Sequence, residues 1–503
     1  MLLHFDTDES LVDSPVPPPM VDPVGDPVGD PVRAAVLAGP FAADIVPNAL
    51  AGQVLTRLGD RDLLDVVIDK AGRRQIRDRS LPSWIVIHVV LALCLFSRES
   101  YGSVLRQIWP ALTRLRGRPV AVPGASALPK ARRRVGAAPF AALFDQIRGP
   151  AATPHTPGVF RFGLRVMAID GTVLDVPDSL DNDAAFDRGT NSTTTAKHPQ
   201  VRLTLLIECA THAVHAARFD GTQTSEHVQA DHLTNDLQPG MLLLADRNYY
   251  SYNRWHTAAN TGAHLLWRMK RSTGKSTGKG TVKLPIQHLL PDGSYLSVLH
   301  EPDSARRSRS QHTGNGTSLQ RRHPPLTVRV IDYTITITLS NTTTRTETYR
   351  LITTILDPDH ATATDLATCY HERWEAETAY GHLKTRLRGP RTILRSHHPD
   401  TVTQEIWAYL CIYQTLCHLA ATAAHHAGLD PDRISFTVTL RELRRTLTNP
   451  TDHPPHQLLN RILQQTLPTR PTRITDRSTK QPGRKRRSWT ATITITIQPH
   501  PSP

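Results

Sequence analysis

The sequence has few cysteines, and their spacing does not match a disulfide framework or a zinc knuckle. There are five, an odd number without a C-x-x-C pair: Cys94, Cys209, Cys369, Cys411 and Cys417. Disulfide frameworks use an even number, and zinc knuckles use closely spaced pairs. We therefore expect a reducing compartment. Histidine is abundant, with 25 residues, but pairs such as His397 and His398 lack partners at metal-ligand spacing, so we expect the histidines at the surface.

Long apolar runs are also missing. The longest, Trp84 to Phe96, has 13 residues, whereas a membrane-spanning helix needs about 20. This length is typical of a buried core helix. The N-terminus shows no basic segment followed by an apolar one, as a secretory signal would. We predict no membrane association and a cytoplasmic protein that associates with the nucleoid.

Acidic residues are fewer than basic ones, 45 against 59, which gives a formal charge of +14 and a pI near 9.8. Such an excess favours a polyanionic partner, of which nucleic acid is the most common. The 503 residues are enough for about three domains with a sizeable core.

The first third of the chain divides into a leader and a helical domain. Residues 1–46 include the proline- and glycine-rich repeat Asp22 to Val32, which cannot build a core, so we expect a disordered leader. Residues 47–150 show helical periodicity between turn signals, which predicts an all-α domain. Its basic clusters, such as Lys130 to Arg134, could contact phosphates or merely increase solubility, and both interpretations stay open.

Strand patterns begin after residue 150. Within residues 151–270, apolar strands and helical segments follow in the order three strands, helix, strand, helix, strand, which predicts an α/β sheet of mixed direction. We interpret residues 271–354 as a β-rich insertion. Residues 355–398 return to helix and complete the core.

C-terminal helices are predicted over residues 399–460, followed by a basic tail over 461–503 that includes Arg484 to Arg487. The tail ends in TATITITI, which resembles YTITITL in the insertion. Both runs are low in complexity, and we attach no significance to their similarity.

The stretch YHERWEAETAYGHLK, Tyr370 to Lys384, carries the strongest chemical pattern. On a helix that advances about 100° per residue, Arg373, Glu377 and Lys384 fall within about 60° of Tyr370. One face therefore has a hydroxyl, a guanidinium, a carboxylate and an ammonium group. Glu372 and Glu375 point the other way and are interpreted as solvated charge. The alternative for the whole stretch is a surface helix with many ion pairs.

Two aspartates stand at the ends of apolar strands. Asp170 ends VMAID and Asp246 ends MLLLAD. Acids in such places reach the edge of a sheet, where ligands bind, although aspartate also caps turns well. If Glu377 joins them, the three carboxylates supply oxygen ligands for Mg²⁺ or Mn²⁺. Two such ions about 3.5–4 Å apart can promote in-line displacement at phosphorus.

The order Asp170, Asp246, Glu377 together with Y-x2-R-x3-E-x6-K resembles the DDE transposases of bacterial insertion sequences, in the insertion-sequence-four type that carries the YREK signature. AIDGTVLDVPDS and LLLADRNYYS are similar to the first two acid motifs of that family. The resemblance covers roughly residues 47 to 445. It implies a ribonuclease-H-like core with a β insertion between the second aspartate and the glutamate.

The resemblance also implies residue roles. Asp170, Asp246 and Glu377 would be catalytic and hold two metal ions, and Tyr370, Arg373 and Lys384 would contact DNA phosphates. The implied activity is cut-and-paste transposition: nicking at the ends of the element, a DNA hairpin on the excised end and strand transfer into target DNA.

The implied partner is double-stranded DNA, both as terminal inverted repeats and as target, within a protein homodimer. We expect residues 47–150, with the basic tail, to bind the ends. A DNA-binding protein that has lost cleavage and a structure-selective nuclease of the same fold are the alternatives.

Two positions depart from the pattern of the family. Asn248 stands where the second motif commonly has glycine, and asparagine tolerates left-handed backbone angles. No tryptophan stands at the place in the insertion where some relatives hold a flipped base. Tyr349 could stack on a base there, or be a core strand residue.

Overall fold

The computed structural model describes residues 60–500, with gaps at 76, 78–79, 118–120, 125, 190–194, 271–281, 302–323, 340–343, 391 and 469–490. The predicted leader over residues 1–46 and the basic run Arg484 to Arg487 lie outside the described residues.

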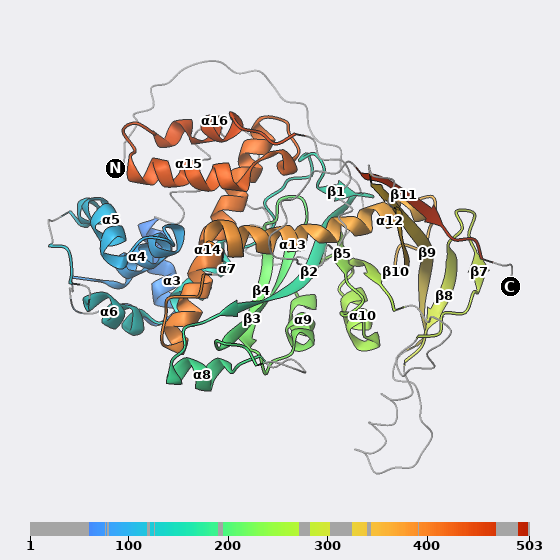
Figure 1. Cartoon of the computed structure of the whole chain (residues 1–503), viewed down its shortest axis with the longest axis horizontal. Coiled ribbons are helices and arrows are strands. Elements are labelled where there is room, and N and C mark those ends of the chain that lie inside the picture. The colour runs from blue at the N-terminus through green and yellow to red at the C-terminus, as the bar shows by residue number, and fades with distance from the viewer. Residues whose placement is uncertain are drawn as a thin grey trace, which may run out of the picture.

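Within the described residues, five helices form the N-terminal part of the fold, and α4, α6 and α7 among them contact the long helix α14 (Figure 1). They are α3 (Arg61–Lys70), α4 (Ser83–Leu95), α5 (Tyr101–Arg116), α6 (Ala127–Val135) and α7 (Ala138–Ile147). Side-chain caps begin two of them, because Asp60 accepts from the Asp62 N–H and Ser100 accepts from the Ser103 N–H. Helix α4 is buried on nearly all sides, which confirms the core helix predicted from its apolar run.

A large mixed sheet forms the centre of the molecule and confirms the predicted α/β fold with strands of both directions. Its strand order is β4-β3-β2-β5-β6-β10-β9-β8-β7, with β1 beside β2 and β11 beside β9. β2 runs parallel to β5 and β5 parallel to β6, whereas the other pairs are antiparallel. The first strands are β1 (Phe160–Arg161), β2 (Leu164–Asp175), β3 (Gln200–Glu208), β4 (Val214–Gly221), β5 (Met241–Ala245) and β6 (His264–Arg268). The later strands are β7 (His288–Leu289), β8 (Tyr295–Leu299), β9 (Leu326–Leu339), β10 (Thr344–Thr353) and β11 (Ala491–Ile497).

Helices cover both faces of the sheet and create two cores. Successive residues of β2 alternate between them: Val166 and Ala168 belong to the large core, and Met167 and Ile169 to the smaller one. The smaller core contains α9 (Glu226–Thr234) and α10 (Tyr252–Ala259), whereas the large one contains the helices that follow β10. The short helix α8 (Leu180–Phe186) follows β2.

The C-terminal strand joins the sheet, which makes our dismissal of the similar β runs wrong. β11 lies antiparallel to β9, from Ala491 opposite Leu339 to Ile497 opposite Tyr333. Alternating threonine and isoleucine suits a strand with one packed face, and Ile495 and Ile497 pack against the large core. At least this part of residues 461–503 is therefore an element of the fold (Figure 1).

The C-terminal helices pack against the N-terminal ones. α14 (Pro399–His426) contacts α4, α7, α15 (Phe436–Thr448) and α16 (Leu458–Leu463). Two 3₁₀ turns, Pro431–Arg433 and Pro455–Gln457, connect these helices. Within the described residues, no helix combines the length and the apolar composition that crossing a membrane requires.

Candidate active site

The signature stretch is helical, as predicted, but its winding changes along its length. It consists of α12 (Ala363–Tyr370), a 3₁₀ turn (His371–Arg373), α13 (Trp374–Gly381) and a π-helical segment (His382–Leu387). The uniform 100° per residue used for the sequence pattern therefore does not hold over the whole stretch. Which side chains share a surface is decided by their contacts with the sheet.

The pairing of β2 with β5 brings the two aspartates side by side. Ala168 lies beside Leu244 in this parallel pair, so the same register two residues further on places Asp170 beside Asp246. Parallel strands lie about 4.8 Å apart, and residues in register point to the same face. That face is the one that the large core covers, because Ala168 and Leu244 both belong to it.

Two buried tyrosines attach the signature helix to this face. The Tyr370 hydroxyl donates to the Ala245 carbonyl at 3.4 Å, directly before Asp246. The Tyr380 hydroxyl donates to the Asp170 carbonyl at 2.5 Å and accepts from the Leu205 N–H at 3.1 Å. The backbone on either side of the candidate site is thus held by hydrogen bonds to one helix.

Lys384 makes a third attachment. Its Nζ donates to Thr172 Oγ1 at 3.0 Å and to the Val173 carbonyl at 2.8 Å, both on the continuation of β2 past Asp170. Lys384 and Tyr370, two of the predicted phosphate contacts, are therefore engaged with strand ends of the protein itself. Their contact with DNA stays a prediction.

Arg373 lies among the three predicted acids. Its Nη2 is 3.8 Å from Glu377 Oε1, and its side chain is 8% exposed, whereas that of Glu377 is 42% exposed. Burial lowers the pKa of Arg373, but Tyr370, Asp246, Asp170 and Glu377 raise it above its ordinary value. The buried Arg373 guanidinium therefore lies near the carboxylates of Asp170, Asp246 and Glu377, and Glu377 is the one of these that is exposed to solvent.

Asp170 is held in a medium that disfavours its charge. Burial raises the pKa of this carboxyl to about 6, and Glu226 and Glu377 act in the same direction. Arg373 and a hydrogen bond from the Gly171 N–H, at 3.0 Å, partly offset the effect. The site therefore has more negative charge than its own cation can balance.

Glu226 belongs to this site, and sequence reasoning missed it. It begins α9 on the opposite face of the sheet, and its carboxylate occupies the space where a side chain at position 171 would lie, so Gly171 lets it approach Asp170. Tyr249, three residues after Asp246, donates its hydroxyl to Glu226. An acid in the first turn of a helix is common for electrostatic reasons, so the residue type alone could not identify it.

The other two glutamates of the signature are not solvated charge, contrary to our expectation. Glu375 is buried and its Oε2 lies 2.7 Å from His212 Nε2. Glu372 accepts from Arg161 Nε at 2.8 Å. Both carboxylates face the protein because the helix is covered on more than one side.

Some histidines are also buried rather than at the surface. His212, with φ +60°, and His371 are 9% and 4% exposed. Together with Glu375 and Asp432, His212 places three possible ligand atoms within 4.8 Å of one another, a compact group that the sequence did not predict.

The two departures from the family pattern have plain structural explanations. Asp246 accepts from the Tyr249 N–H at 2.9 Å through its carbonyl, which closes a turn in which Asn248 keeps a negative φ, so left-handed tolerance is not needed. Tyr349 stacks on Tyr333 with ring centres 5.2 Å apart, and the Arg268 guanidinium lies 3.9 Å from its ring centre. These contacts favour the core interpretation of Tyr349 over base stacking.

Comparison with known families decides the identity of this arrangement. Residues 161–414, half of the chain, match the family described as the transposase DDE domain. The chain belongs to the DDE transposases. Residues 50–145 of this transposase match the N-terminal region of insertion element 4 transposases.

Individual relatives agree with this assignment. The transposase InsG of insertion sequence element IS4 from Escherichia coli K12 is 27% identical over 399 residues, which cover 78% of this chain and 83% of InsG. The putative transposase InsZ of the same organism is 26% identical over 197 residues, 36% of this chain and 64% of InsZ. A piggyBac transposase in a synaptic complex with hairpin DNA aligns with 89% of this chain and 84% of its own, at 11% identity. Its TM-score is 0.36, too low to support an argument.

Proposed function

We propose that this DDE transposase binds the ends of its insertion sequence, cleaves DNA there and joins the ends to target DNA by two-metal phosphoryl transfer. One observation carries the proposal. The register of β2 and β5 places Asp170 beside Asp246 on the face that the Glu377 helix covers. Three carboxylates at one sheet edge are the ligands that such chemistry requires.

The charge of the site suits divalent cations. Asp170, Asp246 and Glu377 act on the buried guanidinium of Arg373, and Glu226 adds a further negative charge beside Asp170. Asp170, Asp246 and Glu377 would hold two Mg²⁺ or Mn²⁺ ions. When bound, these ions supply charge neutralisation and an activated water or 3′-hydroxyl for in-line attack.

The neighbouring residues would keep this geometry rigid. Tyr370 and Tyr380 hold the backbone at Ala245 and Asp170, and Lys384 holds β2 beyond it. As part of the proposal, Tyr370, Arg373 and Lys384 also contact the phosphates of the DNA end. Arg373 contributes a cation that never leaves the site, because it is buried.

The proposed architecture is a ribonuclease-H-like core of residues 151–270 and 355–398, interrupted by a β-rich insertion over 271–354. In support, three antiparallel strands, β2 to β4, are followed by the parallel strands β5 and β6. The helical residues 47–150 would bind DNA ends. We propose a homodimer as the synaptic form, because strand transfer joins two ends to one target.

Cleavage of a labelled duplex that carries the DNA bordering this gene tests the function. With Mg²⁺, the wild type should cut at a defined end, and Glu377→Gln should not, although it should bind the duplex. Glu372→Gln is the matched control, since Glu372 lies on the same helical stretch and pairs with Arg161. Equal cutting by Glu377→Gln and the wild type would refute the assignment.

The same assay separates the alternatives. Binding without cutting by every variant, wild type included, would indicate a DNA-binding protein that has lost cleavage. Cutting without joining, at structures rather than at defined ends, would indicate a nuclease of the same fold.

A further inference from the structure

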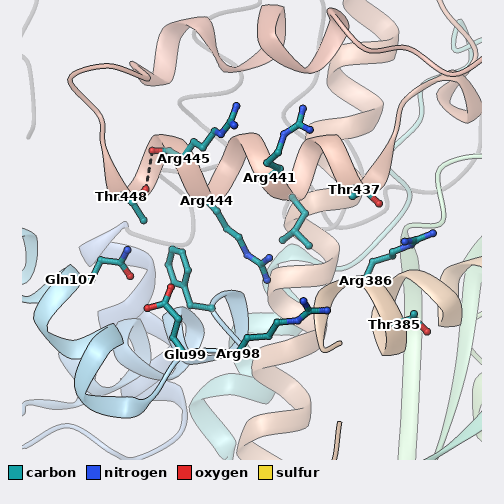
Figure 2. A pocket seen from close by; sticks show the side chains of 12 residues that line it. Arg98, Glu99, Gln107, Thr385, Arg386, Thr437, Arg441, Arg444, Arg445 and Thr448 are labelled. Atoms are coloured by element: carbon teal, nitrogen blue, oxygen red, sulfur yellow. Dashed lines mark hydrogen bonds between the residues drawn. The ribbon is translucent and has the colours of Figure 1, made fainter. Parts of the chain in front are cut away.

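A cleft rich in arginine lies outside the carboxylate site, where three distant parts of the chain meet (Figure 2). It has a volume of about 540 Å³. Its walls come from the turn between α4 and α5, from the π-helical segment after the signature glutamate, and from α15. Its charged lining residues are Arg98, Glu99, Arg386, Arg441, Arg444 and Arg445. We call it the arginine cleft.

Three of these arginines have fixed positions. Arg444 donates from Nε and Nη2 to the Leu95 carbonyl at 2.9 and 2.5 Å, which ties α15 to the end of α4. Arg441 and Arg445 both donate to Glu442 Oε1, at 2.9 and 3.2 Å. The cleft is therefore a built feature: Arg444 is held by a backbone carbonyl, and among the described lining residues Glu99 supplies one negative charge against five arginines.

Arg98 and Arg386 are different. Both are exposed, and among the residues that the structure describes neither forms a hydrogen bond or an ion pair with another side chain. Figure 2 shows the Arg444 side chain extending from α15 toward Arg98 across the cleft. Burial and the charge of Arg98 lower the pKa of Arg444, and although Glu99 and Tyr409 act in the opposite direction, the net shift is downward. The positive charges are thus close enough to repel one another, and a bound anion would relieve this repulsion.

We propose that the arginine cleft binds the phosphodiester backbone of the transposon-end duplex next to the cleavage site. This inference rests on the function proposed above and adds a binding surface to it. The planar guanidinium group matches the geometry of phosphate, and a cleft lined by Arg98, Arg386 and Arg444 suits a repeated anion better than a single one.

The position of the cleft agrees with a continuous DNA path. Arg386 follows Glu377 by nine residues on one helical stretch, which corresponds to about 13 Å at about 1.5 Å per residue. Lys384 attaches this stretch to β2, so the distance from Arg386 to Asp170 is fixed by the fold. A duplex that advances about 3.4 Å per base pair would place a phosphate at Arg386 about four base pairs from the point of cleavage.

The test measures binding without chemistry. A fluorescent 40-base-pair duplex of the DNA that borders this gene is titrated in EDTA over a series of salt concentrations, with wild type and Arg98→Ser/Arg386→Ser. Each phosphate contact contributes about 0.9 to the slope of log K against log salt. The slope should therefore fall by about 1.8, and affinity at 0.1 M salt by about 60-fold. Each single substitution should give about half of the slope change.

Two controls accompany the double variant. Arg98→Lys/Arg386→Lys keeps the charge and should keep most of the slope. Arg188→Ser removes the same charge per residue directly after α8 and should leave the slope unchanged. Figure 1 shows α8 on the side of the molecule away from α15. Ethylation of phosphates about four base pairs from the cleavage point should interfere with binding by the wild type but no longer by the double variant.

The outcomes separate the two proposals. If the wild type binds and the double variant keeps the wild-type slope, the arginine cleft does not contact DNA, and the cleavage assay remains an independent test of function. If the wild type itself fails to bind the duplex, both proposals fail together. If Arg188→Ser lowers the slope as much as either single cleft substitution does, the effect is a general one of net charge, and the inference is overturned.

Discussion

Replacing Asp170 by asparagine is predicted to stabilise the metal-free protein above pH 6. Burial, assisted by Glu226 and Glu377, raises the pKa of this carboxyl from 3.8 to about 6. The folded chain therefore binds this proton more tightly than the unfolded chain does. The wild type loses stability as the pH rises from about 4 to about 6, and the loss is constant above that range.

The size of the effect follows from the same two values. The interval from 3.8 to about 6 corresponds to about 3 kcal/mol, since one pKa unit equals about 1.36 kcal/mol. Asp170 is only half-buried, so solvent screening reduces the expected gain to about 1–2 kcal/mol. Asparagine has nearly the same shape and still offers an oxygen to the Gly171 N–H.

Urea denaturation in EDTA between pH 4 and pH 7.5 measures the effect. The variant and the wild type should be equally stable near pH 4, and their difference should grow to a plateau above pH 6. Mg²⁺ should narrow the difference, because only the wild type offers the ion a carboxylate at this position. Asp181→Asn, at an exposed position on α8, should change the stability by no more than about 0.5 kcal/mol. A difference that does not depend on pH would refute the reasoning.

Three further predictions concern other parts of the fold. Gly171→Ala should displace the Glu226 carboxylate, lower the pKa of Asp170 and shift the acidic limb of the pH profile of cleavage to lower pH; an unshifted limb would contradict the contact. Glu375→Ala should cost about 3 kcal/mol in urea denaturation because it leaves buried His212 without its carboxylate, whereas a cost below about 1 kcal/mol would show that the pair is not structural. Ile495→Asp puts a charge where an isoleucine packs against the large core, so it should detach β11 and remove hydrogen-exchange protection from the amides of β9 that pair with it. If these amides stay protected, the pairing of β11 with β9 does not depend on Ile495.

Local patterns were enough to predict many of the helices and strands and to select the three acids of the proposed site. Apolar periodicity identified α4, and the succession of strands and helices after residue 150 matches β2 to β6, except for the short helix α8, which was not predicted. These patterns depend on the spacing of residues a few positions apart, and that spacing is visible in the sequence. The spacing of Tyr370, Arg373, Glu377 and Lys384 was likewise readable, although the 3₁₀ and π segments alter the geometry inferred from it.

Local patterns could not predict which surface of the signature helix would be covered. Glu375 and Glu377 are the same residue type two positions apart, yet one is buried against His212 and the other is exposed. The difference arises from what the helix packs on. Burial depends on contacts between segments that are distant in the sequence, so the residue type alone does not show whether a glutamate is buried or exposed.

The sequence by itself determined the elements, the order of the acidic motifs and the excess of positive charge. The tertiary structure alone decided that Asp170 lies beside Asp246, that Glu226 enters through Gly171, that β11 completes the edge of β9 and that Arg98, Arg386 and Arg444 face one cleft. Each of these depends on strand register or on the packing of segments tens to hundreds of residues apart. Such contacts are selected by the free energy of the whole fold, because local propensity is the same for many alternative pairings.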